Sequence, residues 1–171
     1  MKQKNIVLIG MPGCGKSTVG VLLAKSAGLQ FADTDLFIQA ETGEHLQSTI
    51  DKGGLAQFLK LEEKILSSLE LQGYVIATGG SAVLSDKAMQ RLKARGTVVF
   101  LDVPLEDIKS RIRNITTRGI AMEKNDSIES VYEKRLPLYK KYADISVLTK
   151  GLTLEQTVEK ISKEIQRKEE Y

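Results

Sequence analysis

The segment Gly10–Ser17, with the sequence GMPGCGKS, constrains the fold of this chain more than any other stretch. It matches G-x-x-x-x-G-K-[ST] in full, between an apolar run over residues 5–10 and a helical pattern over residues 16–27. In that setting the pattern predicts a phosphate-binding loop, because the backbone N–H groups and the positive end of the helix converge on one phosphate. We expect a bound nucleotide to contact Pro12, Gly13, Cys14, Gly15, Lys16, Ser17 and Thr18.

Two side chains of this phosphate loop have predicted chemical roles. Lys16 is expected to reach the β- and γ-phosphates of ATP, and the Ser17 hydroxyl to bind Mg²⁺. Cys14 is the only cysteine, and the only histidine, His45, has no motif that links it to Cys14. We therefore expect Cys14 to supply a backbone N–H to the loop and not a catalytic thiol.

The rest of the chain alternates short apolar strands with helical patterns. Strands are predicted over residues 30–33, 74–78, 97–103 and 145–149, and helices over residues 36–41, 58–69 and 83–93 and after Thr153. Such alternation predicts an α/β fold with a parallel sheet, helices on both faces and ligands at the carboxyl ends of the strands. We expect residues 1–171 to form a single domain.

The composition argues against some classes of partner. The chain has 25 basic and 22 acidic residues, a net charge of +3 at pH 7, which is too mild to imply binding to nucleic acid or a membrane surface. No apolar stretch is long enough to span a bilayer, and a single cysteine excludes an internal disulfide. We expect a cytoplasmic monomer whose partner is a small molecule.

Two carboxylates follow the second predicted strand, in the segment FADTD. One interpretation is that Asp33 holds the metal through water and that Asp35 takes up or orients the proton of an acceptor hydroxyl. The other is that Asp33 or Thr34 caps the next helix and that Asp35 lies favourably in its first turn. The phosphate loop nearby favours the first.

Several motifs in a fixed order resemble the shikimate kinase family over nearly the whole chain. They are GMPGCGKST, FADTD, F-x-x-x-E at Phe58–Glu62, ATGG at Ala77–Gly80, FLDVP, RIRNITTRG at Arg111–Gly119 and KRLPLY at Lys134–Tyr139. The resemblance implies a nucleoside-monophosphate-kinase-like fold with strand order 2-3-1-4-5. It also implies phosphoryl transfer from ATP, with Mg²⁺, to a hydroxyl of shikimate, which gives 3-phosphoshikimate in aromatic amino acid biosynthesis.

The resemblance also implies residue roles. The phosphate and metal residues are Lys16, Ser17 and Asp33, and the acceptor residues are Asp35, Gly79, Gly80, Ser81 and Arg135. Arg111 matches an arginine near the adenine, and the acceptor-binding helices correspond to residues 34–62. Residues 114–126 are polar and aperiodic, as in a mobile lid, from which Arg118 would reach the transferring phosphoryl group on closure.

Three positions depart from the family pattern. Leu59 stands where the family has an arginine for the shikimate carboxylate, Ser81 replaces a third glycine, and Gly119 replaces a proline in the lid. These departures leave two alternatives open: a kinase of the same fold for another hydroxylated metabolite such as gluconate, or a nucleotide-binding regulatory domain without turnover. The presence of Asp35 and Arg118 argues against a pure nucleotide sensor.

Overall fold

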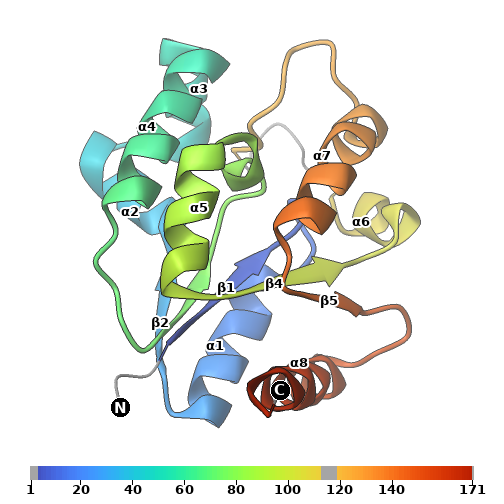
Figure 1. Cartoon of the computed structure of the whole chain (residues 1–171). Coiled ribbons are helices and arrows are strands. Elements are labelled where there is room, and N and C mark those ends of the chain that lie inside the picture. Colours follow the sequence, from blue (N-terminus) through green and yellow to red (C-terminus); the bar gives the residue numbers. More distant parts are fainter. Residues whose placement is uncertain (1–3, 113–118, 171) are drawn as a thin grey trace.

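The computed structural model describes residues 4–112 and 119–170 and contains a five-stranded parallel sheet in the order β2-β3-β1-β4-β5 (Figure 1). The strands are β1 (Asn5–Ile9), β2 (Gln30–Asp33), β3 (Tyr74–Ala77), β4 (Gly96–Asp102) and β5 (Ile145–Leu148). The α/β fold and the strand order are therefore confirmed. β1 lies in the centre, and its five residues are all buried, which explains the unbroken apolar run.

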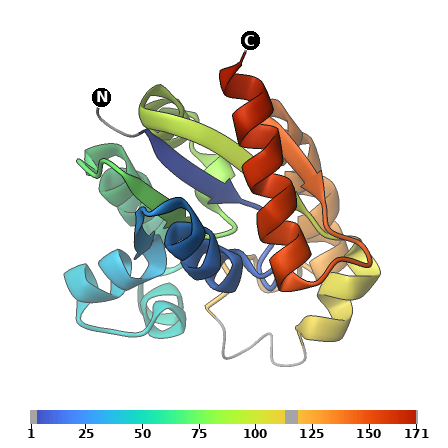
Figure 2. The same cartoon turned by 90° about the horizontal axis from the view of Figure 1, so that it is seen from below.

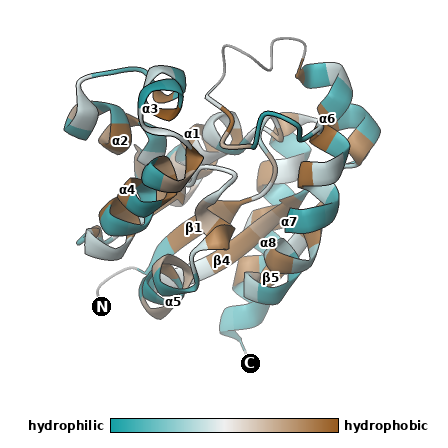
Figure 3. Ribbon diagram, turned by 90° about the horizontal axis from the view of Figure 1, so that it is seen from above, coloured by the Kyte–Doolittle hydropathy of each residue, from teal (hydrophilic) through white to brown (hydrophobic). Residues whose placement is uncertain are grey.

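Helices cover both faces of this sheet. The structure contains α1 (Lys16–Ala27), α2 (Thr34–Thr42), α3 (Leu46–Gly53), α4 (Leu55–Ser68), the 3₁₀ turn η1 (Ala82–Leu84), α5 (Asp86–Arg95), α6 (Leu105–Arg111), α7 (Ile128–Tyr142) and α8 (Leu154–Glu169). Helices α1 and α8 pack on one face, and α5 and α7 on the other (Figures 1 and 2). The strands of the sheet are largely hydrophobic, and hydrophilic residues are frequent on the surrounding helices (Figure 3). In the described part of the chain, no helix is both long and apolar enough to cross a membrane.

A second, smaller apolar cluster holds α2, α3 and α4 together beside the main core. Its buried members are Ile38, Ile50, Phe58 and Ala121, and Leu59 packs against it, partly buried. Ala121 comes from the segment after residue 118, so this cluster also anchors the described end of the predicted lid. The cluster thereby fixes the helices that carry the predicted acceptor site next to the carboxyl edge of the sheet.

The helical bounds differ from the sequence predictions in two places. The helix predicted over residues 83–93 is interrupted, because the Ser85 side chain accepts a hydrogen bond from the Ala88 N–H and starts α5 after η1. Helix α3 was not predicted at all, since Ile50 is its only buried residue and glycines Gly53 and Gly54 mark its end. The closing helix begins as expected, with a capping box between Thr153 and Gln156.

Candidate active site

The phosphate loop lies where the sequence places it, between the end of β1 and the start of α1. Gly15 is the N-cap of α1, has φ 93° and makes no side-chain cap hydrogen bond, so the first turn of the helix presents its N–H groups to a ligand. A side chain at Gly15 would be strained at this φ. The loop therefore has the geometry of an anion site.

Lys16 is buried and directed into this loop. Its Nζ donates to the carbonyl oxygens of Gly10 and Met11, both at 2.8 Å, and lies 3.4 Å from Cys14 Sγ. The ammonium group is thus held at the cavity by backbone oxygens, with 8% of the residue exposed. Cys14 is itself buried and serves as a packing neighbour of Lys16, in line with the structural role expected for it.

The predicted metal residues are in direct contact. Ser17 Oγ donates to Asp33 Oδ2 at 2.6 Å, while Asp33 Oδ1 accepts from the Asp35 N–H at 3.0 Å. Asp33 is therefore the N-cap of α2, as one interpretation of FADTD proposed, and it also holds the Ser17 hydroxyl. Two oxygen ligands at the mouth of a phosphate loop fit Mg²⁺, which favours few protein ligands and phosphate oxygens. Within residues 4–112 and 119–170, no group of three or more His, Cys, Asp or Glu side chains forms a separate metal site.

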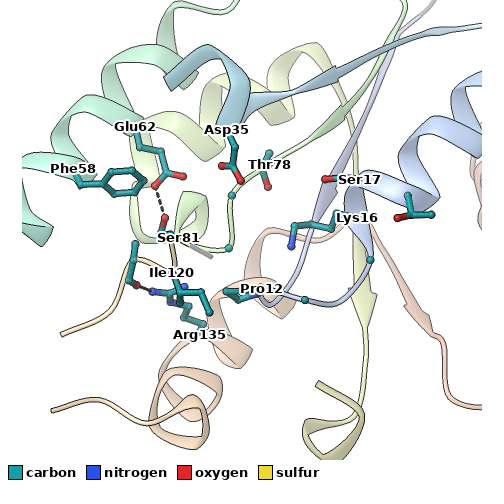
Figure 4. A pocket seen from close by; sticks show the side chains of 17 residues that line it. Pro12, Lys16, Ser17, Asp35, Phe58, Glu62, Thr78, Ser81, Ile120 and Arg135 are labelled. Carbon is teal, nitrogen blue, oxygen red and sulfur yellow. Dashed lines mark hydrogen bonds between the residues drawn. The ribbon is translucent and has the colours of Figure 1, made fainter. Parts of the chain in front are cut away.

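Asp35 lies in the first turn of α2 and faces the same cavity as Lys16 (Figure 4). Burial raises the pKa of Asp35 to about 6, with a further rise from the Asp33 charge and an opposing effect of the Lys16 ammonium. A carboxylate with this pKa is ionised at neutral pH and still basic enough to accept a proton. The place of Asp35 in the first turn of α2 is therefore compatible with proton acceptance.

One cavity of about 310 Å³ joins the phosphate loop to the acceptor residues. It is lined by Pro12, Gly13, Gly15, Lys16, Ser17, Thr18, Asp35, Phe58, Glu62, Thr78, Gly79, Gly80, Ser81, Gly119, Ile120, Ala121 and Arg135. Most of the predicted site residues are therefore brought together. Cys14 and Asp33 do not line the cavity themselves, and Arg118 lies outside the described residues.

The loop after β3 packs tightly against the phosphate loop. A Cβ added at Gly80 would lie 2.6 Å from Cδ of Pro12, and one at Gly79 would lie 2.6 Å from Oε1 of Glu62. Either side chain would therefore push into the cavity wall. Tyr139 fixes this loop from α7, because its hydroxyl donates to the Gly80 carbonyl oxygen at 2.6 Å.

Arg135 occupies the acceptor end of the cavity, one turn before Tyr139 on α7. It is 4% exposed, and its Nη2 donates to the Ala121 carbonyl oxygen. Its Nη1 is buried and has no hydrogen-bond partner among the residues that the structure describes. A buried guanidinium nitrogen that faces a cavity is suited to a carboxylate, with which it forms a charge-assisted hydrogen bond.

Arg111 reaches the nucleotide side of the site from the end of α6. Its Nη1 donates to the Cys14 carbonyl oxygen at 3.4 Å, and the residue is otherwise exposed. This position is next to the phosphate loop and outside the cavity. Its predicted contact with adenine stays a prediction.

The two cavity residues of the F-x-x-x-E motif carried no predicted role of their own. Phe58 and Glu62 lie one turn apart on α4, and both are buried, so the motif places an aromatic ring and a carboxyl group on the same wall. Ser81 Oγ donates to Glu62 Oε2 at 2.6 Å. Spacing alone could have suggested this shared face, but the contact with Ser81 depends on the tertiary structure.

Leu59 does not line the main cavity. It lies on a neighbouring cavity of about 140 Å³, which has Glu62 and Ser81 in common with the first. The side chain of an arginine at this position would begin in the neighbouring cavity and would have to pass Glu62 to reach the acceptor. Ser81 now bonds the carboxyl group of Glu62 at that wall, so two departures from the family pattern, Leu59 and Ser81, are neighbours in space.

Comparison with known proteins assigns the chain to a family. A family model described as shikimate kinase matches residues 12–166. The shikimate kinase of Thermodesulfovibrio yellowstonii is 40% identical over 168 residues, which cover 96% of this chain and 96% of that protein.

Solved structures agree with this assignment. A shikimate kinase from Acinetobacter baumannii in complex with shikimate aligns with a TM-score of 0.89 at 31% identity and covers 97% of this chain and 94% of that one. Shikimate kinase from Aquifex aeolicus aligns with a TM-score of 0.79 at 35% identity, over 95% of this chain and 96% of that one. The chain described here therefore belongs to the shikimate kinase family.

Proposed function

We propose that this protein transfers the γ-phosphoryl group of ATP to a hydroxyl of shikimate and so forms 3-phosphoshikimate. Membership of the family makes it an ATP-dependent kinase with an alcohol acceptor. The observation that supports this reaction most strongly is the single cavity, in which Lys16 and Ser17 lie on one side, Arg135 on the other and Asp35 between them (Figure 4). Both substrates would meet at Asp35.

On the nucleotide side, the chain would hold the phosphates by the N–H groups of the phosphate loop and by Lys16. In this role Lys16 would exchange its bonds to the Gly10 and Met11 carbonyl oxygens for phosphate oxygens. Ser17 and Asp33 would hold Mg²⁺, which when bound neutralises charge on the β- and γ-phosphates. Arg111, which lies beside the loop, would contact the base, and Arg118 would add charge at the transferring group.

On the acceptor side, Asp35 would orient the reacting hydroxyl and accept its proton as the oxygen attacks phosphorus. Arg135 would bind the shikimate carboxylate through Nη1, and the N–H groups near Gly79 and Gly80 would line the ring. These contacts keep the acceptor within one cavity with the phosphate loop, which favours in-line transfer by positioning.

A screen of acceptors tests this proposal directly. Coupled ADP release should be measured with shikimate, gluconate, sugars and polyols, at fixed ATP and Mg²⁺. Shikimate should give the highest kcat/KM, and Arg135→Met should raise the KM for shikimate while the KM for ATP stays within about twofold. Turnover of gluconate in preference to shikimate would support the first alternative. ATP binding without turnover of any acceptor would support a regulatory domain.

The assembly and location of the protein are part of the same proposal. A cytoplasmic monomer remains our prediction, since one complete cavity is formed within a single chain. Size-exclusion chromatography with light scattering tests the oligomeric state, and fractionation of cells tests the location.

A further inference from the structure

Glu62 is a buried carboxyl group at the acceptor end of the cavity, and it is not assigned in the reaction described above. Only 3% of the residue is exposed. Its Oε2 accepts the hydrogen bond from Ser81, whereas its Oε1 is buried without a partner among residues 4–112 and 119–170. Leaving such an oxygen unsatisfied costs about 1–3 kcal/mol, more for a charged group, so a ligand that satisfies it is favoured.

The unpartnered oxygen faces the place where the acceptor would bind. A Cβ built on Gly79 would lie 2.6 Å from Glu62 Oε1 and 3.2 Å from Asp35 Oδ1, so the two carboxyl oxygens flank this glycine from α4 and α2. Both residues line the main cavity. Glu62 Oε1 and Asp35 Oδ1 lie on either side of Gly79, so they can accept hydrogen bonds from two hydroxyl groups of one polyhydroxylated ring.

Charged groups from every neighbouring element act on Glu62. They are Asp35 on α2, Arg135 on α7 and Lys16 in the phosphate loop, together with the Ser81 hydroxyl after β3. The pKa of Glu62 is raised to about 7: burial has the largest effect and the Asp35 charge adds to it, while the Ser81 hydrogen bond, Arg135 and Lys16 oppose it. Near neutral pH the group therefore exchanges its proton readily.

The side chain at residue 59 cannot satisfy Glu62 in this chain. Leu59 has no donor and packs against the apolar cluster of Ile38, Ile50, Phe58 and Ala121. Ser81 is the described donor to the Glu62 carboxyl group, and it occupies Oε2 only. Among the described residues, Oε1 therefore has no donor at this wall of the cavity.

We propose that Glu62 is a specificity-determining residue that accepts a hydrogen bond through Oε1 from a non-reacting hydroxyl of the acceptor, and that Ser81 positions it. This inference rests on the proposed function, because it takes the acceptor to be shikimate. Asp35 would receive the reacting hydroxyl and Glu62 a second one. An acceptor without the second hydroxyl would leave Oε1 buried and unpaired, and the site would discriminate against it.

The test is a double-mutant cycle between the protein and the substrate. Steady-state kinetics should be measured for shikimate and for analogues that lack either non-reacting hydroxyl, with the natural protein, Glu62→Leu, Glu62→Gln and Ser81→Ala. Glu62→Leu should raise the KM for shikimate by roughly ten- to a hundredfold, the loss of one hydrogen bond to a charged group, and leave the KM for ATP unchanged. One of the two analogues should bind poorly to the natural protein and no worse to Glu62→Leu.

Two further variants separate recognition from structure. Glu62→Gln keeps an oxygen acceptor and should retain most of the discrimination against that analogue, while Ser81→Ala should lose part of it, about three- to tenfold. Glu63→Gln is the matched control, because Glu63 accepts a hydrogen bond from Ser85 and does not line the main cavity. This variant should behave as the natural protein. Circular dichroism and ATP affinity report whether each variant is folded.

The outcomes are distinguishable. If the natural protein phosphorylates shikimate but both analogues lose the same factor in the natural protein and in Glu62→Leu, this inference is wrong and the proposed function stands. If the natural protein binds ATP but does not phosphorylate shikimate, the proposed function fails and the inference fails with it.

Discussion

On the nucleotide side of the cavity, the groups from the described part of the chain that would meet phosphate come from one unbroken segment, residues 10–18. The acceptor side instead takes its groups from four segments far apart in the sequence, at Asp35, Glu62, Gly79–Ser81 and Arg135. The first side is built largely from backbone and tolerates little change of geometry, whereas the second depends on individual side chains. A change on the acceptor side therefore needs few substitutions, and Leu59 and Ser81 are two positions there that depart from the family pattern.

The largest effect should come from the nucleotide side. Lys16→Ala removes the ammonium group that the loop directs at the phosphates, and turnover should fall by about 10³- to 10⁵-fold, as for other cations at a transferring phosphoryl group. Coupled ADP release measures the loss, and circular dichroism checks the fold. Near-normal turnover by a folded Lys16→Ala protein would contradict the assignment of the phosphate loop.

The group between the two sides should have the next largest effect. Asp35→Asn keeps the shape of the side chain but cannot accept the proton, so kcat should fall by about 10²- to 10⁴-fold. ATP affinity, measured by calorimetry, should barely change. In the natural protein, kcat/KM should decline as pH falls through about 6, because Asp35 is then protonated. Equal losses of transfer and of ATP affinity would instead place Asp35 in the metal site.

A smaller effect should follow from restoring the family pattern on the acceptor side. The variant Leu59→Arg supplies a guanidinium and keeps the hydrogen bond from Ser81 to Glu62. The KM for shikimate should fall by roughly tenfold or more, since one charge-assisted hydrogen bond contributes about 1.5–3 kcal/mol. Lys60→Arg is the matched control, because adjacent helical positions point about 100° apart. An unchanged KM for shikimate in Leu59→Arg would mean that the missing guanidinium does not weaken shikimate binding.

The last prediction concerns the stability of the fold and not turnover. The folded protein holds protons on Asp35 and Glu62 up to about pH 6 and 7, whereas the unfolded chain releases them near 3.8 and 4.5. The free energy of unfolding should therefore fall as pH rises from about 4 to 7, by at most about 3 kcal/mol for each group. In Glu62→Gln the free energy of unfolding should fall less between these pH values than in the natural protein, whereas in Glu63→Gln it should fall by the same amount. Denaturant unfolding at pH 5 and 8 measures both, and equal slopes in all three proteins would contradict the burial argument.

The two sides also differ in how far the sequence predicts them. The phosphate loop and the start of α1 at Lys16 follow from one contiguous motif whose geometry is local, whereas the Ser17–Asp33 hydrogen bond joins two motifs that are 16 residues apart and was not predicted. The strand order and Arg135 were reached through the resemblance to a family. The bond between Ser81 and Glu62 was not predicted, because it joins α4 to the loop after β3 and needs the packed structure. Helix α3 was missed because it has only 8 residues, with two large apolar ones, Leu46 and Ile50, and ends in glycine.

The central place of β1 has a consequence for the synthesis of the protein. β1 pairs with β3 and with β4, and the first glycine of the phosphate loop lies against β4, since a Cβ at Gly10 would be 2.9 Å from the Leu101 carbonyl oxygen. The loop is encoded within the first 17 residues, yet its shape depends on a strand that ends at Asp102. Chains elongate at about 5–20 residues per second, so a nascent chain spends several seconds with its most conspicuous motif unformed. We therefore expect ATP to bind only after β4 has left the ribosome, and to take no part in the early steps of folding.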